Sequence, residues 1–235
     1  MDGKQFLTYR MAFNLQNFKT RALTAIVFAI VMLAGLLWHG IAFIILFTII
    51  HIGCWFEFIK LIKKIYPATW VMYVPLGLFY ITLPIILMID IRLHDLKYLS
   101  DNFLKIIPCG IVFSIWINDT MAYIVGSLIG KTPFSKISAK KTWEGTIGGA
   151  ILCIVIIAGI GWWTKFYSLT DWICIATICA IFGTLGDLLE SKLKRMANVK
   201  DSGSVMPGHG GFLDRFDSLL IATPFVWLYV HFFMR

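Results

Sequence analysis

Long apolar runs separated by short polar segments dominate this chain of 235 residues. A helix of about 20 apolar residues crosses the roughly 30 Å hydrocarbon core of a membrane. Runs of about that length lie at about 22–38, 40–59, 69–89, 106–130, 146–163, 172–190 and 217–233. The alternating segments of ~10 residues that a membrane β-barrel would show are missing from the sequence. The pattern therefore predicts an all-α, polytopic transmembrane helical bundle of about seven spans, within a range of about six to nine.

Two of the runs contain features that can interrupt a helix. The third run holds Pro75 and Pro84, and a proline inside a helix removes a hydrogen bond and clashes with the preceding turn. We therefore expect the third run to be kinked or split. The fourth run is polar in its second half and is another candidate for a break. A very short turn, Trp38-His39-Gly40, joins the first two runs.

The composition agrees with a membrane protein. Hydrophobic residues make up 59% of the chain and charged residues 14%, whereas about 25% of the residues of soluble proteins are charged. The mean hydropathy is +0.80. The cysteines lie in or beside the apolar runs without a C-x-x-C pair, so we interpret them as small core residues rather than disulfides or zinc ligands. They are Cys54, Cys109, Cys153, Cys174 and Cys179.

The positive charges fall unevenly between the loops. Cytoplasmic loops of membrane proteins carry an excess of lysine and arginine. If the N-terminus is cytoplasmic, most of the 21 lysines and arginines lie in the cytoplasmic segments 1–21, 60–68, 131–145 and 191–216. The opposite side receives only Arg92, Lys97, Lys105, Lys165 and Arg235. We therefore interpret the net charge of +8 as basic loops facing anionic lipid, not as a nucleic-acid surface.

Ionisable residues inside apolar runs are candidates for function because they are costly in a membrane. Asp119 lies in one run, with Tyr123 and Gly126 on the same helical face. Asp187 lies in another run, followed on one face by Glu190, Ser191, Lys194 and Arg195. The alternative is a polar seam that joins two helices. Glu57 is a weaker candidate, because it could simply reach the membrane interface, and we interpret His51 as a hydrogen-bonded packing residue.

The segment K-D-S-G-S-V-M-P-G-H-G-G-F-L-D-R-F-D, residues 200–217, is polar and rich in glycine, in contrast to the apolar runs around it. Its glycines permit positive φ angles and let backbone N–H groups approach an anion. Asp214 and Asp217, together with Asp187, could hold a magnesium ion that also takes phosphate oxygens. Neighbouring cations would neutralise further phosphate charge; they are Lys194, Arg195, Lys200 and Arg215. The alternative is an ordinary cytoplasmic loop that is rich in turn-forming residues.

A second polar segment, S-A-K-K-T-W-E-G-T-I-G-G, covers residues 138–149. It places Lys140, Lys141 and Glu144 directly before an apolar run, and we expect Thr142 to cap the helix that follows. Its glycines suit close helix packing. The sequence contains neither a G-x-x-x-x-G-K-[ST] loop nor a G-x-G-x-x-G turn between strand and helix, so a soluble-type nucleotide fold is not supported.

At these residues the sequence resembles the phosphatidate cytidylyltransferases, also called CDP-diacylglycerol synthases. The signature of that family runs S-x-x-K-R, four residues, K-D, and then P-G-H-G-G-x-x-D-R-x-D. Here it is matched with every spacing kept, at Ser191, Lys194-Arg195, Lys200-Asp201, Pro207 to Gly211, Asp214-Arg215 and Asp217. Two upstream blocks, around Asp119–Gly126 and Lys140–Gly145, are similar to the family as well. The resemblance covers roughly 115 to 220 well and the N-terminal runs only generally.

The resemblance implies an integral membrane nucleotidyltransferase of phospholipid biosynthesis, which converts CTP and phosphatidic acid to CDP-diacylglycerol and pyrophosphate. It implies a need for divalent metal, Mg²⁺, with a second cation as a further candidate. The implied metal ligands are Asp187, Asp214 and Asp217, with Asp201 as another candidate. The implied catalytic residues are Asp187, Asp214, Lys194, Arg195, Arg215 and His209. The implied substrate-binding residues are Asp119, Tyr123, Ser138, Lys140, Lys141, Glu144, Ser191, Lys200, Asp201, Gly208, Gly210 and Gly211.

These inferences give an organisation and a setting for the chain. We expect one integrated membrane domain, with N-terminal transmembrane helices in 1–105 and a catalytic region in 106–235. The expected location is the bacterial inner membrane, with the active site towards the cytoplasm and no nucleic-acid partner. Small-residue helix faces are compatible with a homodimer. One alternative function is a CTP-dependent transferase or kinase acting on a polyprenyl or ether lipid. Another is a transporter in which Asp119 and Asp187 relay protons or cations.

Overall fold

The structure is a computed structural model that describes residues 15–93, 104–135, 137–138, 140–205 and 210–234. These residues form helices, apart from the loops between them and one isolated β-bridge that pairs Pro133 with Thr142. The elements are α1 (Leu15–Leu37), α2 (Gly40–Ile65), the 3₁₀ turn η1 (Trp70–Tyr73), the π-helical turn η2 (Leu78–Thr82), α3 (Leu83–Leu93), α5 (Ile106–Ile129), α6 (Trp143–Thr164), α7 (Leu169–Met196) and α8 (Leu213–Phe232). Each predicted apolar run is helical in the structure, the third as several consecutive pieces, which confirms the all-α bundle.

Among the described residues, five segments are long and apolar enough to cross a membrane, as judged by length and composition. They are Gly40–Ile65, Trp70–Leu93, Ile106–Ile129, Trp143–Thr164 and Leu169–Met196. Helix α1 adds a shorter apolar stretch, Ala22–Leu37. Large apolar side chains cover the outside of the bundle, including Ile45, Phe56, Val155 and Trp163, which are between 55% and 81% exposed. A surface of this kind suits contact with lipid.

The third apolar run is split, as its two prolines predict. It begins as the 3₁₀ turn η1, passes Pro75 in a turn, and continues through the π-helical turn η2 into α3. Pro84 is the second residue of α3, where its missing N–H disturbs the hydrogen-bond pattern of the preceding turn. The turn at Trp38 and His39 between α1 and α2 is as short as expected.

The expectation of a break in the fourth run was wrong, because α5 is one continuous helix of 24 residues. Two of its polar side chains are satisfied by the backbone of the helix itself. The Thr120 hydroxyl donates to Trp116 O at 2.7 Å, and the Ser127 hydroxyl donates to Ile124 O at 2.8 Å. Such local hydrogen bonds let a helix carry hydroxyl groups without interruption.

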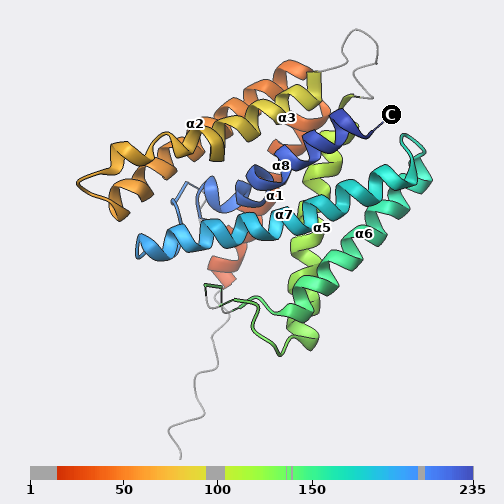
Figure 1. The fold of residues 1–235 in the computed structure, drawn as a ribbon. Helices are drawn as coiled ribbons and strands as arrows, with labels where there is room; N and C mark the ends of the chain where they lie inside the picture. The colour runs from red at the N-terminus through yellow and green to blue at the C-terminus, as the bar shows by residue number, and fades with distance from the viewer. Residues whose placement is uncertain (1–14, 94–103, 136, 139, 206–209, 235) are drawn as a thin grey trace, which may run out of the picture.

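The helices are arranged around α7 and α8, with α2 and α3 on one flank and α5 and α6 on the other (Figure 1). Glycines set the closest approaches between helices. A Cβ atom at Gly149 in α6 would lie 2.7 Å from Cα of Ala122 in α5, and one at Gly186 in α7 would overlap the backbone of Asp217 in α8. The close contact at Gly186 brings the part of α7 that carries Asp187 next to the first turns of α8.

The cysteines are free thiols, as predicted from their positions. Cys54, Cys109, Cys153 and Cys179 are buried, and Cys174 is partly buried. His51 is a packing residue, as interpreted from the sequence, because its Nε2 lies 3.0 Å from both the Thr82 hydroxyl and the Trp55 ring N–H. The division into N-terminal helices and a catalytic region stays a prediction.

Candidate active site

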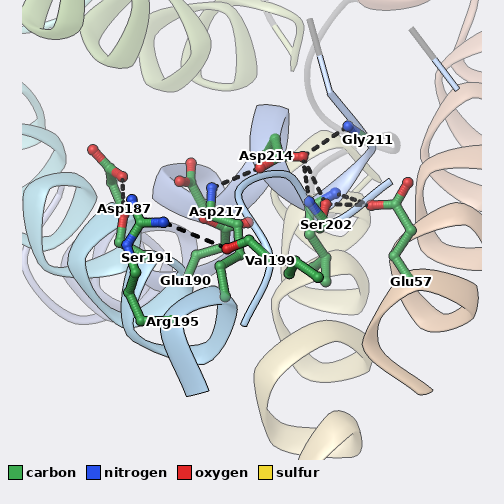
Figure 2. Close-up of polar contacts among 12 residues, drawn as sticks. Glu57, Asp187, Glu190, Ser191, Arg195, Val199, Ser202, Gly211, Asp214 and Asp217 are labelled. Carbon is green, nitrogen blue, oxygen red and sulfur yellow. Dashed lines mark hydrogen bonds and ion pairs between the residues drawn. The ribbon is translucent and has the colours of Figure 1, made fainter. Parts of the chain in front are cut away.

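The candidate site begins with one face of α7 near its C-terminal end. Asp187, Glu190, Ser191 and Lys194 follow one another at spacings of three, one and three residues, which places them on the same side of a helix. The Ser191 hydroxyl donates to Asp187 Oδ1 at 3.2 Å. This polar face is directed towards the first turns of α8, where Figure 2 shows Asp214 and Asp217.

Three carboxylates from the two helices form an acidic cluster. One oxygen each from Asp187, Glu190 and Asp217 lies within 4.8 Å of the others. The Glu190 side chain is fully buried and Asp217 is only 8% exposed, whereas the Asp187 side chain is 29% exposed. Carboxylate oxygens are the ligands that Mg²⁺ prefers. The cluster therefore fits the divalent metal expected from the sequence, and the assignment of Asp187 and Asp217 as its ligands stays a prediction.

The surroundings of the buried Glu190 carboxylate support a cation at this cluster. Its Oε2 lies 2.5 Å from Lys194 Nζ, and apart from this ion pair neither carboxylate oxygen has a hydrogen-bond partner among the described residues. A buried charge is costly unless it is paired and hydrogen-bonded. A divalent cation would compensate such a group. Glu190 was expected on the Asp187 face of the helix but was not predicted as a site residue, although its spacing of three residues from Asp187 indicated one.

Asp214 is held differently from the three clustered carboxylates. Its Oδ1 accepts a hydrogen bond from Lys194 Nζ at 2.6 Å. Its Oδ2 lies 2.8 Å from each of three donors, the Ser202 N–H, the Ser202 hydroxyl and the Gly211 N–H. Lys194 thereby joins Glu190 on α7 to Asp214 on α8. The assignment of Asp214 as a metal ligand stays a prediction.

The loop before α8 depends on its glycines. Gly210 has a φ of +82°, a conformation that residues with a Cβ rarely adopt. A Cβ on Gly210 would also lie only 2.5 Å from Asp214 Oδ2. His209 and Gly208, which the sequence assigned to the site, lie outside the described residues. Lys200, Asp201 and Arg215 are exposed near this loop, and the exposed Arg195 donates to Val199 O at 3.4 Å.

A carboxylate from a distant part of the chain also reaches this loop. Glu57 of α2 is only 1% exposed and accepts hydrogen bonds from the Ser202 hydroxyl at 2.7 Å and from the Phe212 and Leu213 N–H groups at 2.9 Å. The view that Glu57 simply reaches the membrane interface was therefore wrong. The burial of Glu57 could not be predicted from its position near the end of an apolar run, because the residues that cover it lie more than 140 residues later in the chain.

A cavity of about 490 Å³ lies beside the acidic cluster, between α5, α6 and α7. Asp187 belongs to both, so the cavity and the cluster share a side chain. Six predicted site residues line the cavity: Asp119, Tyr123, Ser138, Lys140, Lys141 and Asp187. The Lys141 ammonium forms an ion pair with the Asp187 carboxylate. Polar segments far apart in the sequence thus meet in one place.

The start of α6 is fixed by local contacts. Thr142 caps this helix as predicted, because its side chain accepts a hydrogen bond from the Gly145 N–H at 3.1 Å. Glu144, which the sequence assigned to substrate binding, does not line the cavity. It accepts hydrogen bonds from the Lys131 N–H, the Thr132 N–H and the Thr132 hydroxyl, at 2.7 to 3.2 Å. Glu144 therefore holds the loop after α5 against α6.

Comparisons with known proteins place these features in a wider context. Residues 76–233 match the model of a protein family described as the cytidylyltransferase family. The chain is also similar to proteins named phosphatidate cytidylyltransferase. With the protein from Staphylococcus haemolyticus strain JCSC1435 the identity is 46% over 113 residues, which cover 47% of this chain and 43% of the relative.

Two further relatives carry the same name. The protein from Staphylococcus saprophyticus is 38% identical over 148 residues, which cover 62% of this chain and 53% of the relative. The protein from Bacillus subtilis strain 168 is 43% identical over 115 residues, which cover 48% of this chain and 43% of the relative. The matched part of the chain thus spans about half of the length of these relatives.

Proposed function

The chain belongs to the cytidylyltransferase family, and we propose that it joins CTP to phosphatidic acid, releasing pyrophosphate and giving CDP-diacylglycerol. The observation that carries this proposal is the cavity between α5, α6 and α7, which Lys140 and Lys141 line and in which Lys141 pairs with Asp187, the carboxylate shared with the acidic cluster. Cations and metal-binding carboxylates beside one cavity suit the transfer of a nucleotidyl group between phosphates.

In the proposed reaction an oxygen of the phosphatidic acid phosphate forms a bond to the α-phosphorus of CTP. The bond between that phosphorus and the oxygen bridging to the β-phosphorus breaks, and pyrophosphate leaves with that oxygen. Lys140 and Lys141 bind the triphosphate, and Asp119, Tyr123 and Ser138 contact the nucleotide in the same cavity. Lys194, Arg195, Lys200 and Arg215 supply further positive charge for the phosphates.

Asp187, Glu190 and Asp217 are the residues that would hold a divalent cation. When bound there, Mg²⁺ would supply positive charge for phosphate oxygens. Asp214 orders the loop before α8 through its contacts with Ser202 and Gly211. In this proposal the site faces the cytoplasm of a bacterial inner membrane, because the segments 131–145 and 191–216 that carry its residues are basic.

The proposal is tested with the purified protein in detergent, Mg²⁺, labelled CTP and a panel of lipid phosphates. The panel contains phosphatidic acid, an ether-linked phosphatidic acid and a polyprenyl phosphate. We expect labelled CDP-diacylglycerol and an equal amount of pyrophosphate from phosphatidic acid, and no product when EDTA removes the metal. Product from the polyprenyl phosphate alone, or no CDP-lipid at all, would show that the proposed substrate is wrong.

A further inference from the structure

The first turn of α8 lacks a cap from its own sequence. The N-terminal N–H groups of a helix have no partner inside the helix, and no side-chain cap comes from Phe212 at the N-cap position. The carboxylate of Glu57, from α2, caps the helix instead. Its Oε1 accepts the Phe212 N–H and its Oε2 accepts the Leu213 N–H, both at 2.9 Å. A negative charge at a helix N-terminus is favourable because it complements the helix dipole.

Gly203 and Gly211 pack tightly against the same carboxylate. A Cβ atom on either Gly203 or Gly211 would overlap Oε1 of Glu57. Only glycine therefore allows the backbone to approach Glu57 from both ends of the loop. Because Glu57 is 1% exposed and is absent from the lining of the 490 Å³ cavity, substrate in that cavity does not reach it.

Ser202 connects Glu57 to the residues at the site. Its hydroxyl lies 2.7 Å from Glu57 Oε2 and 2.8 Å from Asp214 Oδ2. A hydroxyl carries one hydrogen and so donates to one of these oxygens at a time. The Ser202 N–H also donates to Asp214. Asp214 in turn contacts Lys194, whose ammonium pairs with Glu190 of the acidic cluster, as the chain of contacts in Figure 2 shows in large part.

We propose that Glu57 is a positioning residue for the transferase site. It fixes Ser202 and Gly203 on one side, and Gly211 to Leu213 with the first turn of α8 on the other, and this sets the direction in which Asp214 and Asp217 face α7. The inference rests on the proposed function, because it assigns Glu57 a role in the rate of that reaction. It also makes a structural statement, the fixing of the loop, that can be tested without any activity.

The test variant is Glu57→Gln, which keeps the shape of the side chain but removes its charge and one acceptor oxygen. The amide NH₂ then faces one of the N–H donors of α8. We expect kcat to fall about 10- to 100-fold, since a displacement of about 1 Å can cost that much, while the KM for CTP changes less than about threefold. Glu57→Asp keeps the charge but is shorter, so we expect it to recover part of the lost kcat.

The control is Asp171→Asn. Asp171 is also a buried carboxylate, 7% exposed, and it accepts hydrogen bonds from the Ser168 hydroxyl at 2.6 Å and the Tyr229 hydroxyl at 2.8 Å. It lies at the start of α7, away from the candidate site. We expect Asp171→Asn to lower the melting temperature but to leave kcat within about twofold of the unsubstituted protein, when both are assayed well below their melting temperatures.

A readout independent of activity is the rate of tryptic cleavage after Lys200 in detergent. We expect faster cleavage in Glu57→Gln than in the unsubstituted protein, and no change in Asp171→Asn. If Glu57→Gln does not yield folded protein, Ser202→Ala removes only the hydroxyl between Glu57 and Asp214. For this variant we expect a severalfold lower kcat with an unchanged KM for CTP.

The outcomes separate this inference from the proposed function. If the unsubstituted protein makes no CDP-diacylglycerol, the proposed function fails, and the cleavage rates still decide whether Glu57 fixes the loop. If the unsubstituted protein is active and Glu57→Gln retains its kcat and its cleavage rate, the positioning role is overturned. It is also overturned if kcat falls in both Glu57→Gln and Asp171→Asn in proportion to their losses of melting temperature.

Discussion

Lys194 is shared by two carboxylates that have different surroundings. Its Nζ lies 2.6 Å from Asp214 Oδ1 and 2.5 Å from Glu190 Oε2. Asp214 also accepts hydrogen bonds from backbone and hydroxyl donors, whereas the Glu190 oxygens have no further partner besides this ion pair among the described residues. Asp214 is therefore suited to ordering the loop, and Glu190 retains lone pairs that a divalent ion can use. Residue types alone did not separate these roles.

Asp187 is the residue whose substitution tests the metal assignment most directly. Asp187→Asn removes one carboxylate from the acidic cluster and leaves the side-chain volume nearly unchanged. We expect turnover of CTP to fall on the order of 100-fold or more, because charge stabilisation in the transition state is lost. The melting temperature without metal should stay close to that of the unsubstituted protein, while the increase on adding Mg²⁺ should become smaller.

Lys64→Ala is the control for this substitution, because Lys64 is exposed on α2 and has no place in the site. We expect it to keep both the turnover and the thermal response to Mg²⁺. Turnover in Asp187→Asn equal to that of Lys64→Ala would contradict the metal assignment.

At the scale of helices, the lengths of the apolar runs and the positions of the prolines predicted most of what the structure contains. The helices follow the apolar runs, and the third run is split at its prolines. The contacts between the helices were less predictable, because these contacts depend on which helix faces meet in three dimensions. Glu57 illustrates the limit, since its partners Ser202, Phe212 and Leu213 are about 150 residues away in the sequence. The polarity of α5 was also misleading, because its hydroxyl groups bond to their own helix.

The contact between α5 and α6 can be tested with two glycines of α6. A Cβ on Gly149 would lie 2.6 to 2.7 Å from backbone and side-chain atoms of Ala122, whereas a Cβ on Gly159 would have nothing within 4 Å. We expect Gly149→Ala to destabilise the protein by about 1–3 kcal/mol, because the two helices must separate. Gly159→Ala should be neutral or stabilising by up to about 1 kcal/mol, because alanine favours the helix.

Thermal unfolding in detergent measures both variants. Because Ala122 also lines the 490 Å³ cavity, Gly149→Ala should in addition weaken the protection from unfolding that CTP provides. Equal stability of the two variants would mean that α5 and α6 are not in close contact at this point.

At the scale of the whole molecule, contacts between the ends of helices group the loops into two sets. The Lys105 ammonium donates to Leu37 O at 2.9 Å, which joins the end of α1 to the start of α5. The pairs Lys141–Asp187 and Glu57–Ser202 join the other ends of the helices. This second set contains the basic segments near Lys64, Lys131 and Lys194. The division of the loops into a basic set and a less basic set, predicted from the charges along the sequence, therefore agrees with the arrangement of the helix ends in the structure.

The orientation of that molecule in the membrane can be measured with single cysteines at exposed lysines. Lys64→Cys and Lys131→Cys lie at the basic end, and Lys165→Cys lies at the opposite end. Because positive loops stay in the cytoplasm, an impermeant maleimide added to intact bacterial cells should label only Lys165→Cys. The other two should be labelled once the membrane is permeabilised. The native cysteines are buried or partly buried, so the unsubstituted chain supplies the background. Labelling of Lys64→Cys in intact cells would reverse the orientation and place the candidate site away from cytoplasmic CTP.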